Sequence, residues 1–201
     1  VARISSNKLL KFISGFYVVL IRQIPLLLQL LFWYFVAFLS ISSTPIEPIG
    51  KIISFSNQGI ELLGLQLSVE FSALLVGLSI YTGASIAEIV RGGINSVPKG
   101  QWEAFRSLGL TERTGLTRIV LPQALPAVIP ALTSQYLNLA KNSTLAIAVG
   151  YSDIYAIGDT IITQTGRAIE GFTILVISFL CLNIAITKAM EGINNIVTHW
   201  Q

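Results

Sequence analysis

The sequence predicts an all-α protein, a polytopic bundle of transmembrane helices, on three observations. Of the 201 residues, 53% are apolar and only 11% are charged, whereas about 25% are charged in a typical soluble domain. The mean hydropathy is +0.72. The charged residues are bunched and leave four uncharged stretches of 17 to 24 residues. Backbone amides in lipid must bond within their own segment, and no alternating pattern indicates a barrel, so we expect these stretches to be helices.

The first predicted span covers residues 14–40. It contains most of the longest uncharged stretch, 23–46. At about 1.5 Å per residue the four uncharged stretches reach roughly 26 to 36 Å, enough to cross a hydrocarbon layer of about 30 Å. The aromatic run 32–35 suits the outer membrane interface, and Pro45 and Pro48 then end the helix.

Three further spans are predicted at 69–91, 117–140 and 171–191. Ser68 can cap the second span, and the Glu70 carboxylate suits the positive end of its helix dipole. The third span contains three prolines, each of which removes a helix hydrogen bond, so we expect this span to be kinked. The four spans together predict a single transmembrane domain over residues 1–201.

The distribution of Lys and Arg predicts how the chain is oriented. Residues 1–24 and 91–118 hold four and five basic residues, whereas 41–67 and 150–170 hold one each. Because basic connections are retained in the cytoplasm, both termini and the loop 91–118 are predicted to be cytoplasmic. The net charge of +3 then follows from topology and needs no nucleic-acid partner.

The connection 91–118 is predicted to hold a short amphipathic helix outside the bilayer. The residues that predict it are a capping Ser96, Pro98 in the first turn, the apolar stripe Trp102, Phe105 and Leu108, a terminating Gly109, and a second cap at Thr111. Periodicity leaves two interpretations open. The helix either rests on the lipid surface or places its apolar stripe in a groove on a soluble partner.

Glu103 and Ala104 begin a spaced motif that continues with Gly109 and then Ile119, Leu121 and Pro122. This spacing resembles the EAA loop of permease subunits in ATP-binding-cassette importers, although Phe105 stands where that pattern has alanine. The resemblance implies a loop that inserts into the ATPase subunit and transmits nucleotide-driven movement. The residues it assigns to this coupling loop are Trp102, Glu103, Ala104, Phe105, Gly109, Ile119, Leu121 and Pro122.

Five further stretches resemble the polar amino-acid branch of these permeases, namely 22–29, 88–93, 97–101, 121–124 and 137–145. The resemblance implies the type I importer permease (MetI-like) fold and a general L-amino-acid subgroup. The family core has five helices, and this sequence looks like the second to the fifth. Since the chain starts with Val1 inside polar, basic sequence, we expect it to be incomplete at its N-terminus.

The resemblance also implies partners and a location. The implied partners are an ATP-binding cassette subunit, a second permease subunit, an external solute-binding protein, an L-amino-acid substrate and the lipid bilayer. The implied location is the inner membrane of a bacterial-type cell. The sequence has no Gly-x4-Gly-Lys-Ser/Thr motif, so we expect no catalytic residue here, with ATP and Mg bound by the separate ATPase subunit. One cysteine, Cys181, and one histidine, His199, predict no internal disulfide and no metal centre.

Lys141 would cost roughly 2.5 to 3.5 kcal/mol if it lay in hydrocarbon. Together with Asn142, Ser143 and Thr144 it is a candidate for the substrate path or its outer gate, where a substrate carboxylate would meet a cation. The alternative is that Lys141 extends to the interface or pairs with a carboxylate. Tyr81 is a further path candidate, with core packing as its alternative.

Two other functions stay open at this point. A secondary transporter driven by an ion gradient would show inverted repeats and a broken-helix ion site, and the sequence shows neither. A non-transporting membrane scaffold would differ in whether the loop 91–118 captures an ATPase.

Overall fold

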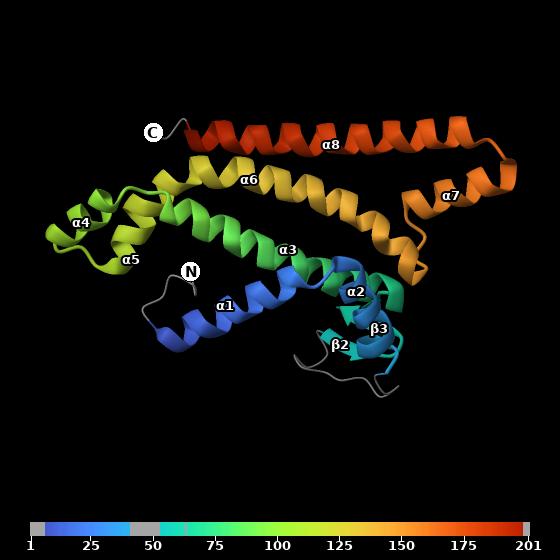
Figure 1. Ribbon diagram of the computed structural model, residues 1–201, viewed down its shortest axis with the longest axis horizontal. Coiled ribbons are helices and arrows are strands. Elements are labelled where there is room, and N and C mark those ends of the chain that lie inside the picture. Colours follow the sequence, from blue (N-terminus) through green and yellow to red (C-terminus); the bar gives the residue numbers. More distant parts are fainter. Residues whose placement is uncertain (1–6, 41–52, 63, 199–201) are drawn as a thin grey trace. The chain divides into compact units, whose positions relative to one another are not determined.

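A computed structural model describes residues 7–40, 53–62 and 64–198, and these are mostly helical (Figure 1). The expected helix break at Pro45 and Pro48 and the tail residue His199 lie outside the described residues. The chain forms two compact units, each made of separated segments. The first unit is Val1–Leu20, Gly83–Asn138 and Leu182–Gln201, and the second is Ile21–Thr82 and Leu139–Cys181.

Within the described residues, three helices are long and apolar enough to cross a membrane. They are α3 (Val69–Asn95), the continuous helical segment Glu112–Val149, and α8 (Ala168–Thr198) over its residues up to Val197. They extend beyond the spans predicted at 69–91, 117–140 and 171–191. The helical segments Lys8–Gln23 and Leu26–Phe38 meet at a bend, and they make a fourth span if they are counted together as one.

The span expected over 14–40 is not one straight helix. It consists of α1 (Lys8–Gln23), α2 (Leu26–Leu31) and the π-helical segment η2 (Phe32–Phe38), and the chain bends by 104° between α1 and α2. The cause lies at Pro25, which has no backbone N–H and disfavours helical geometry in Ile24 before it. A count of apolar residues does not detect such a break, because both sides of it are equally apolar.

In the first unit, the helices around the loop 91–118 follow in sequence order. They are α4 (Lys99–Ser107), α5 (Glu112–Gly115), the π-helical segment η3 (Leu116–Val120) and α6 (Leu121–Asn142). α6 is assigned as one helix through Pro126 and Pro130. Figure 1 shows α4 and α5 beside the end of α3 and the start of α6, where a buried apolar cluster joins them.

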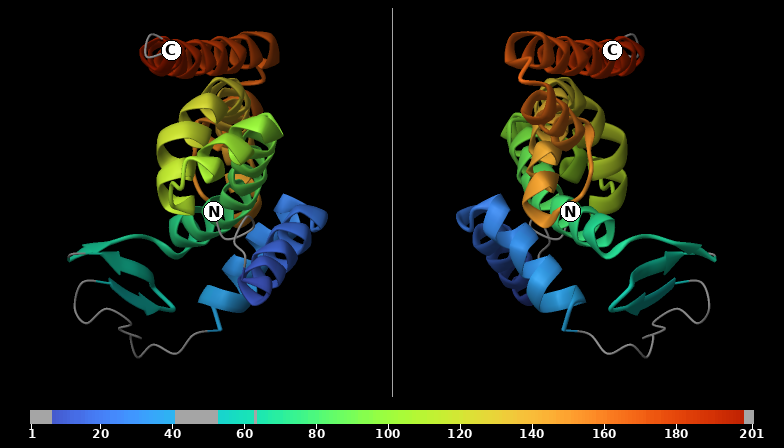
Figure 2. Two further views of the ribbon diagram at one scale, coloured as in Figure 1. Left: turned by 90° about the vertical axis from the view of Figure 1, so that its left-hand side faces the viewer. Right: turned by 90° about the vertical axis from the view of Figure 1, so that its right-hand side faces the viewer.

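The second unit contains a small antiparallel sheet that the sequence analysis did not predict. Its strands are β2 (Ile53–Ser56), β3 (Gly59–Leu62) and β4 (Leu65–Gln66), in the order β2-β3-β4 (Figures 1 and 2). The Ser72 hydroxyl of α3 accepts a hydrogen bond from the Ile60 backbone N–H at 2.9 Å, which fixes the hairpin to the helix. Strands of two to four residues are too short to show a period of two.

The second unit also contains η4 (Ser143–Val149), a 3₁₀ segment, and α7 (Ile154–Thr165), which occupies the connection expected at 150–170. The Asp153 carboxylate caps α7 by accepting the Ala156 N–H at 2.8 Å. α7 and the start of α8 pack through glycines, since a Cβ at Gly158 would lie within 2.9 Å of three Leu175 atoms.

Candidate functional site

The helix α4, expected from the pattern between Ser96 and Gly109, is present but begins later than predicted. The expected cap at Ser96 is wrong: the Ser96 hydroxyl instead donates to the Gly93 carbonyl at 2.7 Å. α3 continues to Asn95, so Ser96 completes the end of α3 rather than starting α4. Pro98 occupies the N-cap of α4 and makes no side-chain cap.

The end of α4 agrees with the sequence. Gly109 has φ +70°, the left-handed conformation that favours glycine, and the Leu110 N–H donates to the Phe105 carbonyl at 3.1 Å. Two residues later the Thr111 hydroxyl accepts the Thr114 N–H at 3.2 Å, so the second predicted cap is confirmed. The chain therefore reverses sharply between α4 and α5.

The Phe105 side chain is buried and is not accessible to a partner protein. This side chain is 0% exposed. It belongs to the loop core, a buried cluster of Ile94, Val97, Phe105, Val120 and Ala124. The expected apolar stripe is therefore divided: Phe105 faces its own chain, whereas Leu108 is 74% exposed outside the core. Periodicity grouped these side chains but did not show which partner buries them.

Phe105 rests directly on Gly115 of α5. Three atoms of the Phe105 ring lie within 2.6 Å of the position that a Cβ on Gly115 would take. A contact this close exists only because position 115 is glycine, whose missing side chain leaves room for the ring. Gly115 directly precedes η3, the segment that leads into α6.

Polar contacts add further ties between α4 and its neighbours. Arg106 Nε donates to Glu112 Oε1 at 2.8 Å, and the Arg106 guanidinium lies 5.8 Å from the centre of the Trp102 ring. Gln123 Nε2 of α6 donates to Gln101 Oε1 at 3.3 Å. All these polar atoms are on exposed or half-buried side chains, so each tie is weak on its own.

The remaining residues of the predicted coupling loop divide into a supporting group and an exposed group. Ile119 and Leu121 are half-buried and pack against the loop core, as does Trp102. Glu103, Ala104, Gly109 and Pro122 are exposed. The structure thus presents an exposed helix surface that carries Glu103 and a protruding Leu108, with Phe105 buried behind it.

Four of the five predicted path residues lie in the second unit at the junction of α6 and η4, and the fifth, Tyr81, lies on α3. Lys141 is exposed, and Asn142, Ser143 and Thr144 are half-buried. The Ser143 and Thr144 hydroxyls both donate to backbone carbonyls one turn earlier, at 2.8 Å. Tyr81 packs against the second unit's core cluster around Leu30 and Leu74, which agrees with the packing alternative.

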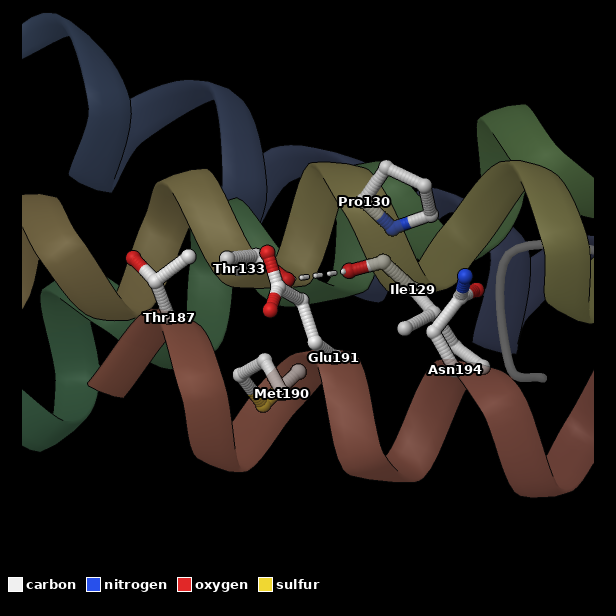
Figure 3. A pocket seen from close by; sticks show the side chains of 7 residues that line it. All are labelled: Ile129, Pro130, Thr133, Thr187, Met190, Glu191 and Asn194. Atoms are coloured by element: carbon white, nitrogen blue, oxygen red, sulfur yellow. Dashed lines mark hydrogen bonds between the residues drawn. The ribbon is translucent and has the colours of Figure 1, made fainter. Parts of the chain in front are cut away.

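A groove between α6 and the end of α8 was missed by the sequence reasoning. It measures about 230 Å³ and is lined by Ile129, Pro130, Thr133, Thr187, Met190, Glu191 and Asn194 (Figure 3). The Glu191 carboxylate points from α8 toward α6 at Thr133. The signal available was the polar repeat Thr187, Glu191 and Asn194 on one helix face. Across the described residues, no three His, Cys, Asp or Glu side chains gather as a metal site.

Sequence comparison finds related proteins along almost the whole chain. Residues 1–196 match the family model for the binding-protein-dependent transport system inner membrane component. The chain is 52% identical over 131 residues to the general L-amino acid transport system permease protein AapQ of Rhizobium johnstonii, covering 65% of this chain and 33% of that protein. It is 36% identical over 187 residues to the probable glutamine ABC transporter permease protein GlnM of Bacillus subtilis, covering 93% and 76%.

The matches cover about a third of the length of the first curated relatives. Among solved structures, the fold is similar to a chain in the crystal structure of an amino acid ABC transporter with histidines. The TM-score is 0.73 at 27% identity, covering 96% of this chain and 79% of that one. A chain of the MetNI methionine ABC transporter has the same fold, with a TM-score of 0.67 at 23% identity, covering 94% and 76%.

Proposed function

The chain belongs to the binding-protein-dependent transport system inner membrane component family, and on this premise we propose that it is a translocating permease subunit of an ATP-driven amino-acid importer. Two relatives carry amino-acid transport in their names, one for general L-amino acids and one for glutamine. We propose an L-amino acid as the substrate. A transporter driven by an ion gradient is disfavoured by this family membership.

The observation that supports coupling to an ATPase is the exposed face of α4. Glu103 and Ala104 lie exposed on a helix whose opposite side is fixed by the buried Phe105. This helix lies between two segments long enough to span a membrane, α3 and Glu112–Val149. A partner that binds the exposed face of α4 can therefore move the ends of two membrane helices. We propose that this partner is an ATP-binding cassette subunit.

The rest of the assembly follows from the same proposal. A second permease subunit completes the translocation path, and an external solute-binding protein delivers the amino acid. ATP and Mg are held by the ATPase subunit, so this chain contributes movement rather than hydrolysis. Lys141, with Asn142, Ser143 and Thr144 beside it, is proposed to meet the substrate carboxylate. α4 and both termini are placed on the cytoplasmic side.

Charge reversal at Glu103 tests the coupling step. The substitution Glu103→Lys reverses the only negative charge on α4, so an ATPase groove that pairs with the Glu103 carboxylate is repelled. ATPase capture and amino-acid uptake should both fall at least tenfold. Uptake of radiolabelled amino acid into proteoliposomes and co-purification of the ATPase subunit measure the two effects. Glu170→Lys, an equal charge change at an exposed site in the first turn of α8, is the matched control. Normal uptake by Glu103→Lys would contradict the proposal.

A further inference from the structure

The contact between Phe105 and Gly115 suggests how movement leaves α4, and this step rests on the proposed function. We propose that the Phe105 ring, seated on Gly115, is the mechanical joint that makes α4 and the start of α6 move as one body. Phe105 is thus a positioning residue, which acts on the transport path through α5 and η3.

The covalent route from α4 to α6 is poorly suited to carry a displacement. It runs through Leu108, Gly109, Leu110 and Thr111, all of which are exposed, and Gly109 has φ +70°. A short exposed connection of this kind has few packed contacts to hold it when α4 is pulled. If this connection alone joined the two helices, a displacement of α4 would bend the turn before it moved α6.

The Phe105 ring provides a second, packed route. It is enclosed by the loop core, whose members come from α3 (Ile94), the α3–α4 connection (Val97), η3 (Val120) and α6 (Ala124). Close-packed side chains transmit a displacement because they cannot be compressed. The polar ties, Arg106–Glu112 and Gln101–Gln123, lie on exposed side chains and are screened by water. Trp102 of α4 also packs against the loop core but is only half-buried. The fully buried ring is therefore the contact that decides whether α4 moves rigidly.

The location of Phe105 separates coupling from docking. Glu103 and Leu108 are both exposed and open to a partner, whereas Phe105 is inaccessible. Shortening Phe105 leaves the exposed face intact and removes only the connection behind it. The proposal therefore predicts an uncoupled transporter that still binds its ATPase.

The test is a double-mutant cycle in the assembled transporter, reconstituted with its permease partner, ATPase and binding protein. Phe105→Ala and Gly115→Ala should each lower amino-acid uptake at least tenfold, the first by removing the ring and the second by displacing it. ATPase capture should stay within twofold of wild type, and ATP hydrolysis should continue without uptake. The double variant should be no worse than Phe105→Ala alone, because the three nearest atoms to the added Cβ are ring atoms.

Glu112→Ala is the control, since it removes the oxygen that accepts from Arg106 Nε but leaves the ring seated; uptake should stay within twofold of wild type. If Phe105→Ala fails to insert, Phe105→Leu is used, with uptake lowered at least threefold at normal capture. The joint is overturned if the inserted variant transports within twofold of wild type, if capture falls in parallel with uptake, or if the two single losses simply add. Failure of the wild-type chain to capture an ATPase would instead refute the proposed function.

Discussion

At the scale of single residues, Gln29 replaces a hydrogen bond that Pro25 cannot make. In a continuous helix the N–H of residue 25 would donate to the Ile21 carbonyl, but proline has no N–H. Gln29 Nε2 donates to that carbonyl at 2.7 Å and to the Ile24 carbonyl at 2.9 Å. Gln29 is 6% exposed despite being polar, so its burial is explained by this repair. The bend after α1 is stabilised by one side-chain amide.

Replacing Gln29 tests this repair. Gln29→Leu keeps a similar volume but leaves two carbonyls without the amide donor, which should lower the free energy of unfolding by about 1 to 3 kcal/mol. Denaturant unfolding of the purified chain in detergent measures the loss. Gln23→Leu, an exposed position at the end of α1, is the control and should stay within about 0.5 kcal/mol of wild type. Equal stability of the Gln29 variant and the control would show that the amide contributes nothing.

At the scale of elements, the β2–β3 hairpin depends on one glycine. Gly59 has φ +111°, and the Ile60 N–H after it bonds to the Ser72 hydroxyl. A Cβ at position 59 would lie 2.8 Å from the Ser72 hydroxyl oxygen and closer still to the Leu67 carbonyl. Gly64 also has a positive φ, +82°, but nothing within 4 Å of its added Cβ. Both glycines have a positive φ and they differ in crowding, so they can be compared as a pair.

Gly59→Ala should therefore cost more than Gly64→Ala. Both substitutions impose backbone strain of about 1 to 3 kcal/mol, and only Gly59→Ala also forces the hairpin away from α3. The expected extra loss is about 1 to 3 kcal/mol, as for an overpacked site. Denaturant unfolding in detergent compares the two variants with wild type. A larger loss for Gly64→Ala would contradict the register of the hairpin.

At the scale of the whole molecule, the apolar surface agrees with a chain solvated by lipid. In α8 the most apolar stretch is only 6% buried within the chain, and its large apolar side chains project outward. Among the exposed ones are Phe172, Ile174, Val176, Ile177 and Leu180. An apolar surface of this extent is unfavourable in water, whereas a bilayer solvates it. Two crossings, α3 and Glu112–Val149, flank the loop that carries α4.

The proposed orientation is tested with single cysteines in a Cys181→Ser background. Ser107→Cys lies on exposed α4 and should react with a membrane-impermeant maleimide from the cytoplasmic side. Ser152→Cys is exposed before α7 and should react from the outside only. Labelling of right-side-out and inside-out vesicles, expressed without ATPase subunits, distinguishes the two faces. The reverse pattern would invert the topology and refute a cytoplasmic coupling loop.

Local chemistry predicted several features correctly. Gly109 and Thr111 end and restart helices as expected, because a left-handed turn and an N-cap depend on a few neighbouring residues. Glu88 and Arg91 also form an ion pair in α3, since residues three apart share a helix face. The resemblance to amino-acid permeases is confirmed by the family model and the named relatives.

Composition and motif spacing were enough to predict the fold class, because long uncharged stretches must become helices in lipid and a spaced motif identifies its family. The inward side of α4 became known from the folded chain, since a helical period is the same whether a side chain meets its own chain or a partner. Phe105 was expected on the surface but is buried, because Gly115 has no side chain and leaves space for the Phe105 ring. The bend after α1 starts from Pro25, but the contact that stabilises it, Gln29 with Ile21, is contained in no hydropathy count.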